Sequence, residues 1–291
     1  MILPALLLFQ AATTAQTGAF ESRRLIESSG VAVSRAHAGV LWTHNDSGDG
    51  PYLYATDLRG RDRGFLLVPG ADAVDWEDMA LGPCPTRPGT CVYLADTGDN
   101  LERRPSVTVY AVLEPDPPAG SGDTLRVSAA PAVLQLRYPD GAHDVEAIYV
   151  SPRDSALYLV SKGWRGGIRL YRVTRAQWKA ADAVRGVATA AALQMLDIRP
   201  SAEAGGLVTG AAIRADGRLV AIRTYSEIYL FTPIVGGRLA PARERPCDIA
   251  GLEPAGGGEA IDFLDDSTLV LTSEAAQRRR GTISTVVCPK Q

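Results

Sequence analysis

The sequence predicts an all-β fold, a β-propeller of five four-stranded blades, and three observations support this. Short segments rich in Val, Ile, Leu and Tyr alternate with turns of Gly, Pro, Asp and Asn over most of the 291 residues, which is typical of antiparallel strands. A unit of this kind recurs along the chain, as in repeat architectures. Helical periodicity is almost absent, and residues 175–184 are the one segment expected to form a short helix, inserted at the rim.

Each unit opens on a short apolar strand that is entered through Gly or Glu. These first strands are expected at SSGVAVS (28–34), DWEDMAL (75–81), DVEAIYV (144–150), VTGAAIR (208–214) and GGEAIDF (257–263). Second strands follow at GVLWTHN (39–45), CVYLADT (91–97), ALYLVSK (156–162), RLVAIRT (218–224) and STLVLTSE (267–274). Third strands follow at PYLYATD (51–57), VTVYAVL (107–113), GIRLYRV (167–173), EIYLFTP (227–233) and GTISTVV (281–287). Fourth strands are expected at GFLLVPG (64–70), VLQLRYP (133–139) and ALQMLDI (192–198). Four antiparallel strands repeated around an axis form propeller blades.

The repeat also predicts how the ring closes. It aligns five residues at one position, and five blades then account for the chain: Gly30, Glu77, Glu146, Gly210 and Glu259. The segment SRRLIES (22–28) is expected to supply the outer strand of the last blade and so to join the two chain ends. Six blades remain an alternative if the two longest units contain further weak strands.

Composition limits the location and partners of the protein. Residues 1–15 include a run of about ten apolar residues followed by small ones, which predicts a signal peptide ahead of a single domain over 16–291. We therefore expect a secreted or periplasmic protein. The net charge of −3 gives no reason to expect a nucleic acid partner. No later apolar segment is long enough to span a membrane, and a monomer is expected.

Four cysteines, an even number, suit an oxidising compartment. Cys84 and Cys91 bracket a turn rich in Pro and Gly, so their pairing is the first choice, and Cys247 then pairs with Cys288. No C-x-x-C spacing is present, which argues against a thiolate metal site.

Charged residues gather where the first strands begin and the second strands end, and both places lie at one mouth of the central channel. The first strands contribute Asp75, Glu77, Asp78, Asp144, Glu146 and Glu259, and the second strands end in His44, Asn45, Asp46, Asp96, Lys162, Arg223, Thr224 and Glu274. Converging carboxylates raise one another's pKa values unless cations or hydrogen-bond donors compensate them. The sequence leaves two explanations open. One is a hard cation with oxygen ligands, most naturally calcium, and the other is a salt-bridged plug neutralised by Lys162, Arg223 and His44.

Several residues near this mouth have a structural and a functional interpretation. The pieces DSGDG (46–50) and DTGDN (96–100) are either tight turns whose side chains cap their own backbone or cation-binding loops. His44 is either a proton donor and acceptor or a structural histidine. Lys162 and Arg223 are candidates to hold a phosphate or carboxylate of a ligand. Trp42, Trp76 and Trp164 either stack on a sugar or separate the blades.

The motifs HNDSGDG, DWEDMAL, ADTGDN, DVEAIYVSP and GEAIDF resemble those of a group of secreted bacterial propeller proteins of uncharacterised function. More remotely, the chain is similar to calcium-dependent propeller hydrolases, the phytase-like and the gluconolactonase and paraoxonase-like families. The remote resemblance implies calcium held by acids that enter the channel. Carried onto this chain, it gives the ligand candidates Asn45, Glu77, Asp96, Glu146 and Glu259.

Three functions follow as hypotheses. The first is a binding propeller whose acidic mouth holds calcium and whose partner is a small molecule, a glycan or an extracellular protein. The second is a metal-dependent hydrolase of phosphoesters or lactones, with His44, Glu146, Lys162 and Arg223 as candidate catalytic residues. The third is a glycoside hydrolase that uses paired carboxylates.

Overall fold

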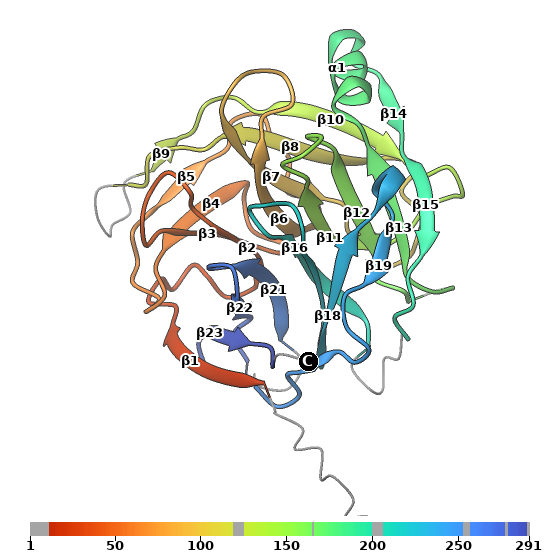
Figure 1. Cartoon of the computed structure of the whole chain (residues 1–291). Coiled ribbons are helices and arrows are strands. Elements are labelled where there is room, and N and C mark those ends of the chain that lie inside the picture. The colour runs from red at the N-terminus through yellow and green to blue at the C-terminus, as the bar shows by residue number, and fades with distance from the viewer. Residues whose placement is uncertain are drawn as a thin grey trace, which may run out of the picture.

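The computed structural model describes residues 12–118, 125–164, 166–199, 206–252, 257–276 and 279–289. Within these ranges the strands form five sheets arranged around an axis, so the five-bladed propeller is confirmed and the six-bladed alternative is wrong. Figure 1 shows the first strand of every blade nearest the centre. These inner strands, which all occur where the sequence predicts them, are β2 (Ser28–Val33), β6 (Trp76–Pro83), β11 (Val145–Val150), β16 (Val208–Ile213) and β21 (Gly258–Phe263).

Each inner strand pairs antiparallel with the second strand of its blade, and that strand pairs with a third. The second strands are β3 (Leu41–Asn45), β7 (Thr90–Asp96), β12 (Leu157–Ser161), β17 (Val220–Thr224) and β22 (Thr268–Ser273). The third strands are β4 (Tyr52–Thr56), β8 (Val107–Leu113), β13 (Arg169–Val173), β18 (Glu227–Pro233) and β23 (Thr282–Val287). Both sets confirm the predicted repeat.

The outer edges of the blades vary more. The predicted fourth strands are present as β5 (Phe65–Leu67), β10 (Ala132–Arg137) and β15 (Ala191–Met195), and blade 4 adds the unpredicted β19 (Leu239–Pro241). The further strands β9 (Arg126–Val127) and β14 (Val187–Thr189) pair in parallel with β5 and β10, and β20 (Cys247–Asp248) pairs with β18. A short 3₁₀ helix, η1 (Val235–Gly237), precedes β19.

The chain ends close the ring, but not through the segment that the sequence analysis assigned. The closing strand is β1 (Thr13–Ala19), which pairs antiparallel with β23, and in Figure 1 the red β1 lies beside the dark blue β23. The prediction that residues 22–28 form the closing strand was wrong. That segment instead links the last blade to β2, and the Asn45 side chain accepts hydrogen bonds from the main-chain N–H groups of Ile26 and Glu27. The predicted signal peptide overlaps β1 at residues 13–15, and residues 1–11 lie outside the described residues.

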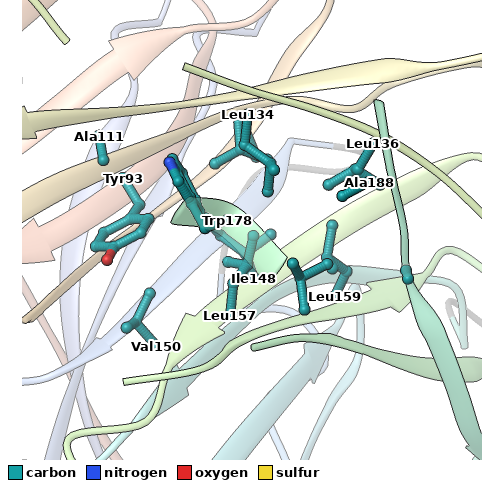
Figure 2. Close-up of a cluster of buried hydrophobic side chains, with 14 of the residues drawn as sticks. Tyr93, Ala111, Leu134, Leu136, Ile148, Val150, Leu157, Leu159, Trp178 and Ala188 are labelled. Atoms are coloured by element: carbon teal, nitrogen blue, oxygen red, sulfur yellow. The ribbon is translucent and has the colours of Figure 1, made fainter. Parts of the chain in front are cut away.

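The predicted rim helix is confirmed as α1 (Arg175–Val184). Its N-cap is Thr174, whose hydroxyl accepts from the main-chain N–H of Gln177 while the Gln177 side chain accepts from the Thr174 N–H, which forms a capping box. Trp178 is the buried anchor of this helix. Figure 2 shows it between Tyr93 and Leu134 in the apolar core that blades 2 and 3 share.

Both predicted disulfides are present, Cys84–Cys91 within the β6–β7 turn and Cys247–Cys288 between blades 4 and 5. The second joins residues 41 positions apart, and closing a loop of this size restricts the unfolded chain. Disulfides persist in oxidising compartments, where extracellular and periplasmic proteins are found. In the described part of the chain, no helix has the length and apolar character needed to cross a membrane.

Candidate functional site

A β-bulge interrupts every inner strand near its start. Pairing with the second strand skips one or two residues in each blade, between Ser28 and Gly30, Trp76 and Met79, Val145 and Ala147, Val208 and Gly210, and Gly258 and Ile261. A bulge redirects the extra side chain away from the regular pleat. We call the first skipped residues the bulge ring: Ser29, Glu77, Glu146, Thr209 and Glu259.

The bulges correct the alignment that the sequence predicted for two blades. Ser29 and Thr209, not Gly30 and Gly210, are the counterparts of the three glutamates. Gly30 and Gly210 lie one residue later and pair with His44 and Arg223. Every blade therefore places a polar side chain in the bulge ring.

A second set of side chains follows the ends of the second strands, at the same end of the blades. Asn45, Asp96, Ser161, Thr224 and Ser273 pair with equivalent inner-strand residues. The residues directly after them form what we call the turn ring: Asp46, Thr97, Lys162, Tyr225 and Glu274. Main-chain hydrogen bonds confirm the equivalence, since the N–H groups of Asp46, Lys162 and Glu274 donate to the residue just before or at the start of each inner strand.

Two groups of carboxylates in and beside these rings are close enough to hold a metal ion. One group is Asp46, Asp75 and Glu77, the other is Glu77, Asp144 and Glu146, and within each group one oxygen per residue lies within 4.8 Å of the others. Glu77 belongs to both groups. Blades 1, 2 and 3 thus converge on one carboxylate.

Gly98 provides the space that this arrangement requires. A Cβ atom at position 98 would collide with the carboxylates of Glu77 and Asp75. The Gly98 N–H donates to the main-chain oxygen of Asp75 at 3.2 Å, and the neighbouring Thr97 hydroxyl donates to the Val145 oxygen at 2.7 Å. The loop after β7 is therefore held directly against the carboxylates.

Burial and mutual repulsion make these carboxyl groups hard to ionise. Burial, followed by the nearby Glu146, Asp46 and Asp75, raises the pKa of Glu77 well above its ordinary value. Burial and the charge of Asp46 raise the pKa of Asp75 to about 6, and burial also raises the pKa of Asp46. A positive charge in this position would reverse these shifts.

Lys162 is the cation that the chain places beside Glu146 and Asp144. Its Nζ lies 2.6 Å from Glu146 Oε1 and 3.9 Å from Asp144 Oδ2. Burial is the largest single influence and lowers the pKa of Lys162, but the attraction and hydrogen bond of Glu146, together with Tyr225 and Asp144, outweigh it and raise the pKa. The salt-bridge interpretation is therefore correct for the blade 3 pair, while Asp46, Asp75 and Glu77 lie outside the ion pairs that Lys162 forms.

Three other predicted ligands serve the framework or lie apart from both groups. Asn45 Oδ1 accepts from the N–H groups of Ile26 and Glu27, and its Nδ2 donates to Asp49. Asp96 accepts from Arg104 at 2.9 Å and from the Asp75 N–H at 3.2 Å. Glu259 belongs to neither metal group.

The DTGDN turn follows the capping interpretation. Asp99 Oδ2 accepts from the main-chain N–H groups of Arg103 and Arg104 at 2.6 and 2.7 Å. The Asp99 N–H itself donates to Asp144 Oδ1 at 2.8 Å, which fixes the orientation of this carboxylate. In the DSGDG turn, Asp46 Oδ1 accepts from the N–H of Ser47 in the same way.

His44 and Arg223 lie deeper than the acidic groups. The His44 side chain is fully buried, its Nδ1 lies 2.8 Å from the Asn45 oxygen, and its ring meets Trp76 edge to face. Burial lowers the pKa of His44 to about 4, so it is neutral at pH 7. Arg223 Nη1 donates to the main-chain oxygens of Ala260 and Thr272. Both side chains thus bond to main-chain oxygens, His44 to that of the next residue on β3 and Arg223 to those of β21 and β22 in blade 5.

The tryptophans differ in burial. Trp42 and Trp76 are buried in the core that blades 1 and 2 share. Trp164 follows β12 and is 56% exposed on the face that carries the turn ring.

Asp78, the second residue of the β6 bulge, has a role that sequence reasoning missed. It is fully buried, and its carboxylate accepts from the N–H groups of Met79, Ile148 and Ala211 at 2.8, 2.8 and 3.2 Å. One side chain of blade 2 thereby bonds the inner strands of blades 3 and 4. The signal available in the sequence was the pair of adjacent acids Glu77 and Asp78 in an otherwise apolar strand. Because successive side chains of a strand point in opposite directions, two adjacent acids are not expected to face the same way.

Comparison with known proteins leaves the family of the chain unassigned. No family model matches it, and no curated protein matches it. Among solved structures it is similar to a glucose dehydrogenase at 12% sequence identity and a TM-score of 0.45, over 95% of this chain and 100% of that one. A likeness this weak says nothing about a shared activity, so the functional conclusion depends on the site itself.

Proposed function

We propose that this protein is a calcium-binding propeller that uses the face carrying the bulge and turn rings to bind a small ligand. The observation that carries the proposal is the pair of carboxylate groups that share Glu77. Calcium prefers carboxylate oxygens and tolerates irregular arrangements of six to eight ligands. Asp75, Glu77 and Asp144 are the principal ligands in this proposal, with Asp46 and Glu146 completing the shell.

Two features of the site support a cation rather than a purely structural acid cluster. Gly98 lets the loop after β7 pack directly against the carboxylates of Asp75 and Glu77, where any other side chain would collide with them. The pKa values of Glu77 and Asp75 stay raised because Lys162 and Arg104 offset only part of the burial and of the repulsion by neighbouring acids. A bound divalent cation would stabilise both as carboxylates.

The test is a pair of variants at equivalent ring positions. Calorimetric titration of calcium into chelator-treated protein should show one tight site in the wild type. Glu77→Gln should weaken binding by about a hundredfold or more, because one charged ligand shared by both groups is lost. Glu259→Gln is the matched control, since it removes the same charge from the bulge ring of blade 5, and it should retain calcium binding. Equal loss in both variants would show general electrostatic attraction and refute a site centred on Glu77.

A metal-dependent hydrolase of phosphoesters or lactones is the second candidate, and Glu146 favours it. Burial raises the pKa of Glu146 to about 7, which suits proton transfer at neutral pH. If the protein is a hydrolase, a panel of aryl phosphates, lactones and aryl glycosides should reveal calcium-dependent turnover that Glu146→Gln abolishes. Absence of turnover across the panel with calcium bound would leave the binding function alone. Turnover of aryl glycosides only would favour the paired-carboxylate alternative.

A further inference from the structure

Blades 3 and 5 carry the same two ring positions with different chemistry. Blade 3 has Glu146 in the bulge ring and Lys162 in the turn ring, and the two form an ion pair at 2.6 Å. Blade 5 has Glu259 and Glu274 at these positions. An acid thus stands in blade 5 where blade 3 supplies an ammonium group.

Neither glutamate of blade 5 forms an ion pair with a described residue, although Lys162 attracts both of them. Among the described residues, no hydrogen bond or ion pair involves the carboxyl group of Glu259 or Glu274. Glu259 is only 8% exposed. Burial and the charges of Glu146 and Glu274 raise its pKa well above the ordinary value, and the attraction of Arg223 opposes this shift without cancelling it. Burial, followed by Asp46 and Glu27, raises the pKa of Glu274 to about 7.

Blade 4 adds an independent unsatisfied group at the neighbouring position of the bulge ring. Thr209, the bulge-ring residue between Glu146 and Glu259, is 1% exposed, and its hydroxyl has no hydrogen-bond partner among the described residues. The next residue, Gly210, packs so closely on blade 5 that a Cβ there would lie 2.8 Å from the main-chain oxygen of Glu259. A buried hydroxyl without a partner is costly to the fold, and a ligand that donates a hydrogen bond to it would remove this cost.

We propose that Glu259, Glu274 and Thr209 form a subsite for the primary ammonium group of a small ligand. An ammonium group has three N–H donors, and the two carboxylates and the hydroxyl offer one acceptor for each. Tyr225, the turn-ring residue of blade 4, stands close enough to interact electrostatically with both glutamates. On blade 3, the ammonium group of Lys162 pairs with Glu146, the residue at the bulge-ring position that Glu259 occupies on blade 5.

The subsite is distinct from the calcium position. Glu259 and Glu274 belong to neither carboxylate group that brings its oxygens within 4.8 Å. An ammonium group bridges acceptors through separate hydrogen bonds, whereas a divalent ion requires them gathered in one shell. A small ligand with a primary ammonium group is thus the class expected for the proposed function, and this assignment rests on that function only in placing the ligand on the face that carries the two rings.

The test uses n-butylammonium as the probe, with n-butyltrimethylammonium as a control that keeps the charge and lacks N–H donors. Calorimetry on the calcium-loaded protein should show one n-butylammonium site. Glu274→Gln should weaken it by about tenfold or more, because a charge-assisted hydrogen bond is lost. Thr209→Val should weaken it severalfold while raising the melting temperature, since the unpartnered hydroxyl is removed. Asp216→Asn, which removes an exposed charge in the β16–β17 turn at the opposite face, should leave it unchanged.

The two proposals fail separately. Glu77→Gln should lose calcium and retain n-butylammonium, and Glu259→Gln should do the reverse. Equal binding of the trimethylated probe, or unchanged affinity in Glu274→Gln, would overturn the ammonium subsite. A second calcium ion that disappears in Glu274→Gln would overturn it as well, because these residues would then form a metal site.

Discussion

Replacing Asp78 with alanine is expected to destabilise the protein more than removal of any other charged side chain. The carboxylate accepts three main-chain N–H groups, which belong to Met79, Ile148 and Ala211 on three different inner strands. Each buried N–H left without an acceptor costs about 1–3 kcal/mol, so the free energy of unfolding should fall by about 3–5 kcal/mol, or the chain should fail to fold. Urea unfolding followed by circular dichroism measures the loss.

Two controls separate this role from a general effect of charge. Asp78→Asn keeps one carbonyl oxygen and should lose less stability than Asp78→Ala. Asp216→Ala removes an exposed aspartate that pairs with Arg214, and it should change stability by less than about 1 kcal/mol. A loss below about 1 kcal/mol for Asp78→Ala would mean that the three N–H groups find other acceptors, and Asp78 would not join the blades.

The second large effect concerns pH and calcium together. In the metal-free protein the folded-state pKa values of Asp75, Glu146 and Glu274 are raised to about 6, 7 and 7. A carboxyl group with a raised pKa holds its proton longer in the folded than in the unfolded state, so its contribution is greatest below about pH 4 and is lost as the pH rises through 6 to 7. The metal-free protein should therefore lose stability between pH 5 and pH 7.5.

Calcium should reverse this loss, because it binds the ionised form. At a calcium concentration about a hundredfold above the dissociation constant, linkage gives about 2.7 kcal/mol, or about 5–10 °C in melting temperature for a chain of this size. The calcium effect should be small at pH 5 and largest near pH 7.5. Melting curves of desalted protein with and without calcium at four pH values provide the measurement. A metal-free protein that becomes more stable from pH 5 to pH 7.5, with no response to calcium, would contradict the electrostatic description of the site.

The fold was predictable because its signals are local. Each inner strand combines an apolar run with a turn, and the unit recurs often enough to define the blades. The pairing of Cys84 with Cys91 followed from the short turn between them. The helix at Arg175–Val184 was visible because its periodicity differs from that of the surrounding strands.

The closing strand could not be found in the same way. β1 has the composition of an exposed edge, TTAQTGA, with no apolar alternation. It also overlaps the segment that resembled a signal peptide. The alternative segment, residues 22–28, looks more like a strand, yet Asn45 binds the main chain of Ile26 and Glu27 and fixes them as a crossing link.

The site was predictable in its location but not in its membership. Sequence placed Glu77 and Glu146 at one end of the channel, and the structure brings them together. The bulges, however, shift the register by one or two residues, and this moves Ser29 and Thr209 into the ring in place of two glycines. Hydrogen bonds to the main chain, which no residue pattern reveals, assign Asn45 to the framework.

A crystal structure grown with calcium chloride tests most directly whether the carboxylates around Glu77 hold a calcium ion. We predict an anomalous peak about 2.3–2.6 Å from a Glu77 carboxylate oxygen, with Asp75 or Asp144 also in contact. The absence of a peak at saturating calcium, with Glu77 and its neighbours unchanged, would contradict the claim and assign these acids to a protonated, metal-free cluster.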